Sequence, residues 1–150
     1  MVKEGEKAPT FKLKGSDGKE HTLEELNKDT LVLYFYPKDR TPGCTIEAQE
    51  FTKLKKEFEK VNAKVVGVSA DDLESHEKFI NSCSLDILLL SDPKSEVIKK
   101  YGAYGDRGVF GKGTLRNTYI IKGGKVVKAF ERVNAKGHAY EVLEFLKKES

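Results

Sequence analysis

The sequence is poor in several residue types that mark particular protein classes. Its 150 residues include no tryptophan, one methionine and only two cysteines, Cys44 and Cys83. Two cysteines are too few for the disulfide framework of a small secreted domain. No run of about 18 apolar residues is present, so we expect no membrane-spanning helix. Because no apolar stretch follows residues 1–6, we also expect no signal peptide and predict a cytoplasmic protein.

An excess of charge of one sign is also missing. Lysine and arginine total 27 and aspartate and glutamate 24, which gives a net charge of +3. This mixed surface does not indicate nucleic-acid binding. His21, His76 and His138 lack metal-ligand spacing, so we expect no metal and interpret them as surface or structural side chains. With 38% hydrophobic residues, the chain fits one folded domain spanning residues 1–150.

The hydrophobic pattern predicts an α/β fold with a mixed central sheet flanked by helices. Alternating residues 11–14 and 19–22 flank an Asp-Gly turn, which is typical of a β-hairpin. The continuous apolar run 31–36 indicates a strand buried on both faces. We expect further strands at 64–69, 87–90, 118–121 and 126–130, helices at 44–61, 72–82, 95–101 and 139–148, and an irregular glycine-rich segment at 105–114.

The segment 37–48, Pro-Lys-Asp-Arg-Thr-Pro-Gly-Cys-Thr-Ile-Glu-Ala, carries the most specific signal. It follows a buried strand and opens an amphipathic helix. Thr41 is a suitable N-cap residue, and Pro42 is favoured at the first helical position. Cys44 then lies in the first turn, where free N–H groups and the helix dipole favour a thiolate. Inert packing is the alternative for a lone cysteine, but this turn is an unusual place for it.

These residues resemble a known family. The pattern Pro37-x-x-x-Thr41-x-x-Cys44 resembles the peroxidatic motif of peroxiredoxins. Segment 42–48 is similar to their Q type, also called bacterioferritin-comigratory-protein-like. Segment 5–11 is similar to the start of that family, and 116–121 to its strand bearing the active-site arginine. The resemblance covers almost the whole chain and implies a thioredoxin-like fold with an N-terminal β-hairpin extension and no metal or prosthetic group.

The resemblance also implies an activity and a role for each site residue. The activity is thiol-dependent reduction of hydrogen peroxide and organic hydroperoxides, with thioredoxin or a similar dithiol as reductant. By the family pattern Cys44 is the peroxidatic nucleophile and Pro37 shields its sulfur. Thr41 hydrogen-bonds to sulfur and peroxide, Arg116 stabilises the thiolate and the transition state, and Glu47 orients the arginine.

Ionisation alone cannot explain fast chemistry at such a sulfur. A thiol with a pKa of about 8.5 is roughly 3% ionised at pH 7, so complete ionisation gains at most about thirtyfold. Donors that stabilise negative charge on the departing oxygen are needed as well. The Thr41 hydroxyl, the backbone N–H groups of Gly43 and Cys44, and an arginine are the candidates.

The second cysteine departs from one common pattern of the family. Many Q-type members carry a resolving cysteine five positions after the first, where this chain has Gln49. A subset resolves from the helix that here ends near Cys83, so the resemblance implies that Cys83 is the resolving residue. A disulfide needs Cα atoms about 4.4–6.8 Å apart. Because a cysteine in the first turn of a packed helix does not meet this requirement without motion, we predict local unwinding around Cys44, Cys83 or both.

Two alternatives stay open at this point. Cys83 follows Phe79 and Ile80 at helical spacing, so it fits a core thiol, which would leave a one-cysteine peroxidase. The other alternative is a non-enzymatic redox sensor or binding protein on the same fold. Since no apolar stripe indicates an obligate partner, we expect a monomer.

Overall fold

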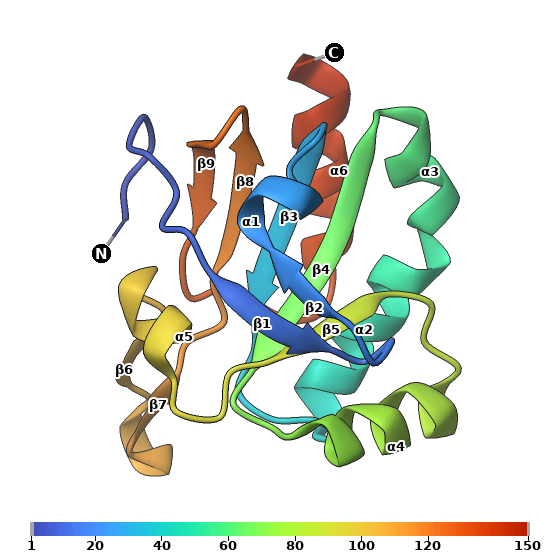
Figure 1. Cartoon of the computed structure of the whole chain (residues 1–150). Helices are drawn as coiled ribbons and strands as arrows, with labels where there is room; N and C mark the ends of the chain where they lie inside the picture. The colour runs from blue at the N-terminus through green and yellow to red at the C-terminus, as the bar shows by residue number, and fades with distance from the viewer. Residues whose placement is uncertain (1, 150) are drawn as a thin grey trace.

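The computed structural model describes residues 2–149 and is built around a seven-stranded mixed sheet (Figure 1). The strands run in the order β2-β1-β5-β4-β3-β8-β9. Their bounds are β1 Lys12–Gly15, β2 Glu20–Thr22, β3 Thr30–Phe35, β4 Ala63–Ser69, β5 Leu88–Ser91, β8 Thr118–Lys122 and β9 Lys125–Phe130. The helices are α1 Leu23–Leu26, α2 Pro42–Lys53, α3 Lys55–Lys60, α4 Leu73–Cys83, α5 Glu96–Lys100 and α6 His138–Glu149.

Strand β3 explains why its segment is apolar at every position. All six of its residues are buried. Leu31, Leu33 and Phe35 belong to the core on the face covered by α1 and α5. Val32 and Tyr34 belong to the opposite core, which α2, α3, α4 and α6 cover. Because successive side chains point to opposite faces, a central strand covered on both sides must be apolar throughout.

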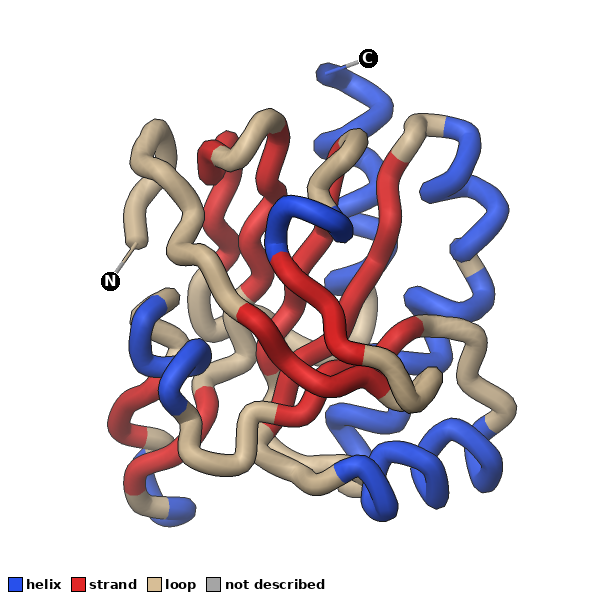
Figure 2. The backbone as a smooth tube through the Cα atoms, in the orientation of Figure 1, coloured by secondary structure: helices blue, strands red, loops and turns tan. Residues whose placement is uncertain are grey.

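The direction of the central strands brings two loops together. Strand β3 pairs in parallel with β4, and β4 in parallel with β5. The loops that follow β3 and β4 therefore leave the sheet at the same edge. Figure 2 shows these loops at the lower edge of the molecule, where they lead into α2 and α4. The fold thus places the start of α2, which carries Cys44, beside the start of α4, the helix that ends at Cys83.

Most of the predicted elements are confirmed. The N-terminal hairpin is formed by β1 and β2, with Lys12 opposite Thr22. The second hairpin is formed by β8 and β9 around the two glycines at 123–124. The mixed sheet with helices on both faces confirms the predicted α/β class. No helix within residues 2–149 is long and apolar enough to cross a bilayer.

Two predictions about local structure are wrong. The helical segment expected to continue without a break to residue 61 divides at Leu54 into α2 and α3. The segment 105–114 is not irregular throughout. It contains most of a two-stranded antiparallel sheet, β6 (Tyr104–Asp106) and β7 (Lys112–Thr114), joined by a short 3₁₀ helix. Glycines at 108 and 111 with positive φ make the tight connection, so their abundance marks a hairpin rather than an absence of order.

Candidate active site

Cys44 lies in the first turn of α2, as predicted. The helix begins at Pro42, and Thr41 occupies the extended N-cap position before it. The backbone N–H of Thr45 already donates to the Thr41 carbonyl, so the N–H groups of Gly43 and Cys44 belong to the unpaired first turn. Residue Cys44 is only 1% exposed, and its thiol is free. The sulfur is therefore more enclosed than is usual for a reactive thiol.

Arg116 is the cation beside this sulfur. Its Nη2 lies 3.6 Å from Cys44 Sγ, and its Nη1 lies 2.8 Å from Glu47 Oε1. The residue precedes β8, and its carbonyl accepts a hydrogen bond from Val133 N–H. One end of the guanidinium is thus fixed on a carboxylate, while the other faces the sulfur. A fixed positive charge at this distance stabilises a thiolate and the charge that develops during its reaction.

Glu47 is fully buried one turn after Cys44 on the same helix. Burial raises the pKa of Glu47 to about 7, although the Arg116 charge and hydrogen bond act in the opposite direction. Among the described residues, the only buried side-chain oxygen or nitrogen atoms without a hydrogen-bond partner are Glu47 Oε2 and Tyr34 Oη. One carboxyl oxygen of Glu47 therefore holds the Arg116 guanidinium, and the pKa of the group lies near neutral pH.

Thr41 differs from the sequence prediction in its hydrogen bond. It occupies the N-cap position, but its hydroxyl donates to the Lys38 carbonyl at 2.7 Å and does not cap α2. It makes no hydrogen bond to Cys44 Sγ in this structure. The turn before the helix brings the Lys38 carbonyl close enough to take the hydroxyl proton. The hydroxyl oxygen keeps its lone pairs for a donor on a ligand.

Gly43 and Pro37 are the two remaining predicted residues of the segment that leads to Cys44. A Cβ atom at Gly43 would lie 3.0 Å from Arg116 Nη2, so the absence of a side chain there lets the guanidinium approach. Pro37 is half-buried directly after the last buried tyrosine of the β3 segment, Tyr36. The predicted residues Cys44, Glu47, Gly43 and Arg116 are therefore brought together.

Cys83 is not bonded to Cys44. It is the last residue of α4, half-buried and free, and Ser82 Oγ at 3.6 Å is its hydrogen-bond neighbour. It packs against the same apolar core to which Cys44 belongs. Ser84, the next residue, ends the helix in the left-handed conformation with φ 52°. The structure thus places both thiols on one side of the sheet, on two different helices.

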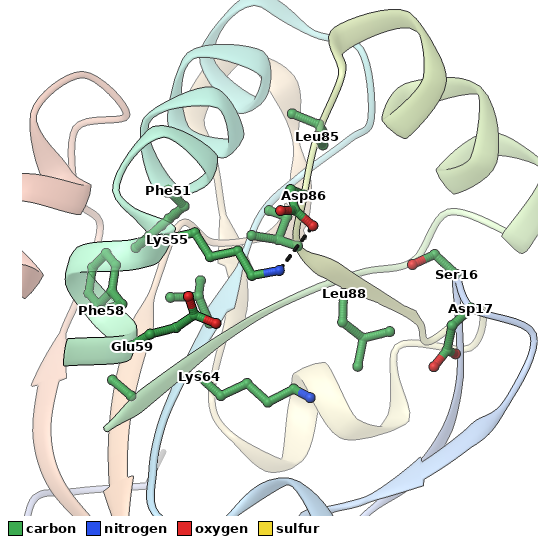
Figure 3. A pocket seen from close by; sticks show the side chains of 13 residues that line it. Ser16, Asp17, Phe51, Lys55, Phe58, Glu59, Lys64, Leu85, Asp86 and Leu88 are labelled. Atoms are coloured by element: carbon green, nitrogen blue, oxygen red, sulfur yellow. Dashed lines mark hydrogen bonds and ion pairs between the residues drawn. The ribbon is translucent and has the colours of Figure 1, made fainter. Parts of the chain in front are cut away.

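A cavity of about 550 Å³ lies next to the segment that follows Cys83 (Figure 3). Phe51 and Phe58 line it, and Lys55 reaches across to Asp86 at 3.0 Å. Asp86 N–H also donates to Thr52 Oγ1 at 3.1 Å. None of the residues that line this cavity is Cys44, Thr41 or Arg116. Its relevance is that the chain after Cys83 is fixed to α2 and α3.

Sequence reasoning missed a buried polar cluster beside the Cys44 loop. The Asp39 carboxylate accepts hydrogen bonds from Tyr36, Ser75 and His76. Of the two interpretations given to the histidines, surface or structural, burial excludes the first, because His21, His76 and His138 are 6%, 0% and 2% exposed. Their structural role stands, since each has a carboxylate neighbour. Spacing gave no signal for this cluster, because its members come from separate elements. Within residues 2–149, no His, Cys, Asp or Glu side chains are grouped to hold a metal ion.

Comparisons with known proteins agree on one family. The model of the AhpC/TSA family matches residues 4–130. A protein named putative peroxiredoxin bcp from Helicobacter pylori is 53% identical over 146 residues, covering 95% of this chain and 96% of that protein. Peroxiredoxin Bcp from Bacillus subtilis is 39% identical over 147 residues, covering 95% and 94%.

Solved structures give the same result. A mutant of peroxiredoxin Q from Xylella fastidiosa superimposes with a TM-score of 0.95 at 34% identity, covering 99% of this chain and 98% of that one. The bacterioferritin comigratory protein of Xanthomonas campestris, whose structure was analysed for its alkyl peroxide reduction activity, has a TM-score of 0.87 at 36% identity, covering 93% and 91%. The chain therefore belongs to the AhpC/TSA family, among its Bcp or peroxiredoxin Q members, and is a thiol peroxidase.

Proposed function

We propose that this peroxidase works with two cysteines, with Cys44 as the nucleophile and Cys83 as the resolving thiol. The Cys44 thiolate attacks one oxygen of a hydroperoxide ROOH, and the O–O bond breaks. The attacked oxygen stays on sulfur as a sulfenic acid, and the other leaves as RO⁻, which takes a proton to become ROH. Sulfur is oxidised by two electrons and the peroxide is reduced by two.

The observation that carries this proposal is the contact of Arg116 with the sulfur. A guanidinium fixed by the buried Glu47 carboxylate, with its free end 3.6 Å from Cys44 Sγ, is placed to stabilise the anionic sulfur and the leaving oxygen. The first-turn N–H groups of Gly43 and Cys44, which have no acceptor within the helix, are two further candidate donors. The Thr41 oxygen is available to accept the hydrogen bond of the peroxide O–H, because its own proton is used on Lys38.

Access to the sulfur requires movement of the surrounding loops. Cys44 is 1% exposed, and the segment 131–137 passes close to its helix turn, with Ala135 Cβ 3.7 Å from the position a Gly43 Cβ would take. A small displacement of this exposed segment, or of residues 37–43, opens a path to the sulfur. In this proposal Pro37 limits the path to the sulfur. The substrates are hydrogen peroxide and organic hydroperoxides.

Resolution joins Cys83 to the oxidised Cys44. The Cys83 thiolate attacks the sulfenic sulfur, a disulfide forms and the oxygen leaves as water after protonation. Asp86 is fixed beside Thr52, which lies roughly 12 Å along α2 from Cys44 at the rise of a helix. The three residues from Cys83 to Asp86 span up to about 10 Å when extended. Unwinding the last turn of α4 and the first turn of α2 therefore brings the two sulfurs within bonding distance.

The rest of the cycle follows from ordinary thiol chemistry. Thioredoxin or a similar dithiol reduces the Cys44–Cys83 disulfide by thiol–disulfide exchange and returns both thiols. Such a cycle belongs in a reducing compartment, and so we retain the cytoplasm as its location. We also propose that the enzyme acts as a monomer, because every residue of this mechanism comes from one chain.

A thioredoxin-coupled peroxide assay on two serine variants tests the proposal. Cys44→Ser is expected to fall to the rate of the reaction without enzyme. Cys83→Ser is expected to consume about one equivalent of peroxide and then stop. Full activity in Cys44→Ser would overturn the assignment of the nucleophile. Full thioredoxin-dependent turnover in Cys83→Ser would show that Cys83 only packs in the core, and that the enzyme uses one cysteine.

A further inference from the structure

A buried ion pair joins the Cys44 loop to the helix that carries Cys83. His76 Nδ1 lies 2.7 Å from Asp39 Oδ2, and the two side chains are 0% and 1% exposed. The other ring nitrogen, Nε2, lies 2.8 Å from the Leu90 carbonyl. Both neighbours are acceptors, so both ring nitrogens donate only when His76 is protonated. The geometry therefore holds a charged imidazolium against a carboxylate inside the protein.

Asp39 is bound from three directions. Besides His76, its carboxylate accepts hydrogen bonds from Tyr36 Oη at 2.6 Å and Ser75 Oγ at 2.8 Å. Its backbone N–H donates to Asp71 Oδ2 at 2.9 Å. The loop residue Asp39 is thus connected to the end of the β3 segment, to the β4–α4 loop and to the first turns of α4.

This connection controls the two segments that must move. Asp39 is five residues before Cys44, and His76 is seven residues before Cys83. Within α4 only His76 and Phe79 are fully buried, so the ion pair attaches this helix to the rest of the molecule together with the apolar contacts of Phe79, Ile80 and Cys83. The Cys44 loop can swing outward only if Asp39 leaves His76 or takes α4 with it.

We propose that Asp39 and His76 are a positioning pair that holds the closed arrangement and sets the rate at which Cys83 resolves oxidised Cys44. This proposal rests on the two-cysteine mechanism proposed above. Separating a buried, hydrogen-bonded ion pair is costly, because each charge would be left without its partner. Opening for disulfide formation therefore has to overcome this pair, and weakening the pair speeds resolution.

The pair also makes resolution dependent on pH. The groups that face His76 are Asp39 in the loop, Asp71 before α4, the Tyr36 hydroxyl and the Leu90 carbonyl of β5. Burial by itself lowers the pKa of His76, but the hydrogen bond and charge of Asp39, the Leu90 carbonyl and the Asp71 charge raise it overall. The ion pair is therefore fully present below the ordinary histidine pKa and is lost as the pH rises through the raised value.

Stopped-flow kinetics of single turnovers test the proposal with His76→Asn and Asp39→Asn. Peroxide is mixed with reduced enzyme, and the oxidation and resolution phases are followed separately. We expect the ratio of the resolution rate to the oxidation rate to rise at least fivefold in both variants at pH 6–7. The sulfinic acid formed at Cys44 under excess peroxide should fall in proportion.

The pH profile separates this role from a merely structural one. Ionisation of the attacking thiol is common to all variants, so it cancels in the ratio of variant to wild-type resolution rates. This ratio should fall toward one at alkaline pH, because the wild-type protein then also lacks the ion pair. His21→Asn is the matched control, since His21 is buried between Asp17 and Glu25 but lies in the N-terminal hairpin. It should leave the ratio unchanged. If the stronger variants fail to fold, Ser75→Ala removes one hydrogen bond to Asp39 and should give about a twofold rise.

The outcomes distinguish the two proposals. If wild-type enzyme forms no Cys44–Cys83 disulfide, the two-cysteine mechanism fails. If wild-type enzyme forms the disulfide but the variants resolve at its rate or slower, or keep the same advantage at every pH, the positioning role of Asp39 and His76 is overturned.

Discussion

The surroundings of the two cysteines differ in how firmly they hold the sulfur. Cys44 is enclosed at the packed start of α2, where Glu47, Ala48 and Phe51 are also buried. Cys83 is half-buried at the last residue of α4, between exposed neighbours and before a strained left-handed residue, Ser84. In the reduced protein one thiol is enclosed beside a cation, while the other lies at a helix end with exposed neighbours.

This difference matches what the two chemical steps require. Attack on a peroxide depends on donors and charges that are already in position when the O–O bond breaks, so a fixed site is favoured. Resolution requires one sulfur to travel to the other, so a weakly held helix end is favoured. Substitutions that loosen the rigid site or tighten the mobile one therefore test the comparison.

The largest effect is expected from Arg116→Met. This change removes the charge 3.6 Å from Cys44 Sγ and leaves the buried Glu47 carboxyl without its partner. Loss of one such donor from a preorganised site lowers the rate by about 10²–10³, measured as the second-order rate constant with hydrogen peroxide. Arg107→Met is the control, because Arg107 stacks on Phe110 near the β6–β7 hairpin. Equal losses in both variants would contradict the role of Arg116.

Glu47→Gln should lower the same rate constant by about tenfold, because the neutral amide holds the guanidinium less firmly. It should also change how stability depends on pH. The pKa of Glu47 is about 7 in the folded protein and 4.5 as the ordinary value, so between these pH values the folded state keeps a proton that the unfolded chain has released. The contribution of this proton to the free energy of unfolding is fully present below pH 4.5 and is lost as the pH rises through 7.

Chemical denaturation at pH 5 and pH 8 measures this contribution. From pH 5 to pH 8, the free energy of unfolding of the wild-type protein should fall by up to about 3 kcal/mol more than that of Glu47→Gln. Glu59→Gln, which neutralises an exposed carboxylate of α3, is the control and should behave as wild type. A wild-type profile that Glu47→Gln leaves unaltered would show that Glu47 does not titrate in this range.

Gly43→Ala should have a smaller effect. The added Cβ would lie 3.0 Å from Arg116 Nη2, so the guanidinium must shift by a few tenths of an ångström from the sulfur. We expect about a fivefold lower rate constant for oxidation by peroxide. The control is Gly113→Ala, whose Cβ would meet only the flexible Arg107 Cδ at 3.5 Å. If Gly43→Ala lowers the rate constant no more than Gly113→Ala does, the close approach of Arg116 to residue 43 is contradicted.

The smallest effect is expected at the mobile end. Ser84 has φ 52°, a conformation that glycine adopts without the cost it imposes on other residues. Ser84→Gly should stabilise the end of α4 and slow resolution two- to threefold, while oxidation of Cys44 stays unchanged. Asn62→Gly relieves the same conformation, φ 57°, before β4 and serves as the control. Faster resolution in Ser84→Gly would contradict unwinding at this end.

Sequence patterns predicted the parts of the fold that depend on local chemistry. The apolar run of β3, the Asp-Gly hairpin and the start of α2 at Pro42 each follow from neighbouring residues. The hairpin at residues 104–114 was missed, because glycines that form tight turns also occur in irregular loops. The division of the long helix at Leu54 was missed as well, since neither glycine nor proline marks it.

The site was predicted only as far as the motif reaches. Cys44 and Glu47 lie on one helix turn, but Arg116 is distant in the sequence and was identified through the family resemblance alone. The Asp39–His76 pair joins residues 37 positions apart, and nothing in either local sequence indicates the contact. Such pairs depend on the order and direction of β3, β4 and β5, which bring their loops to one edge.

Intact mass spectrometry after one equivalent of hydrogen peroxide tests the central claim most directly. Reduced enzyme should lose two hydrogens, and peptide mapping should find a single linkage between Cys44 and Cys83. Retention of one oxygen on Cys44 with Cys83 still free, or an unchanged mass with the peroxide unconsumed, would contradict the assignment of Cys44 as nucleophile and Cys83 as resolving thiol.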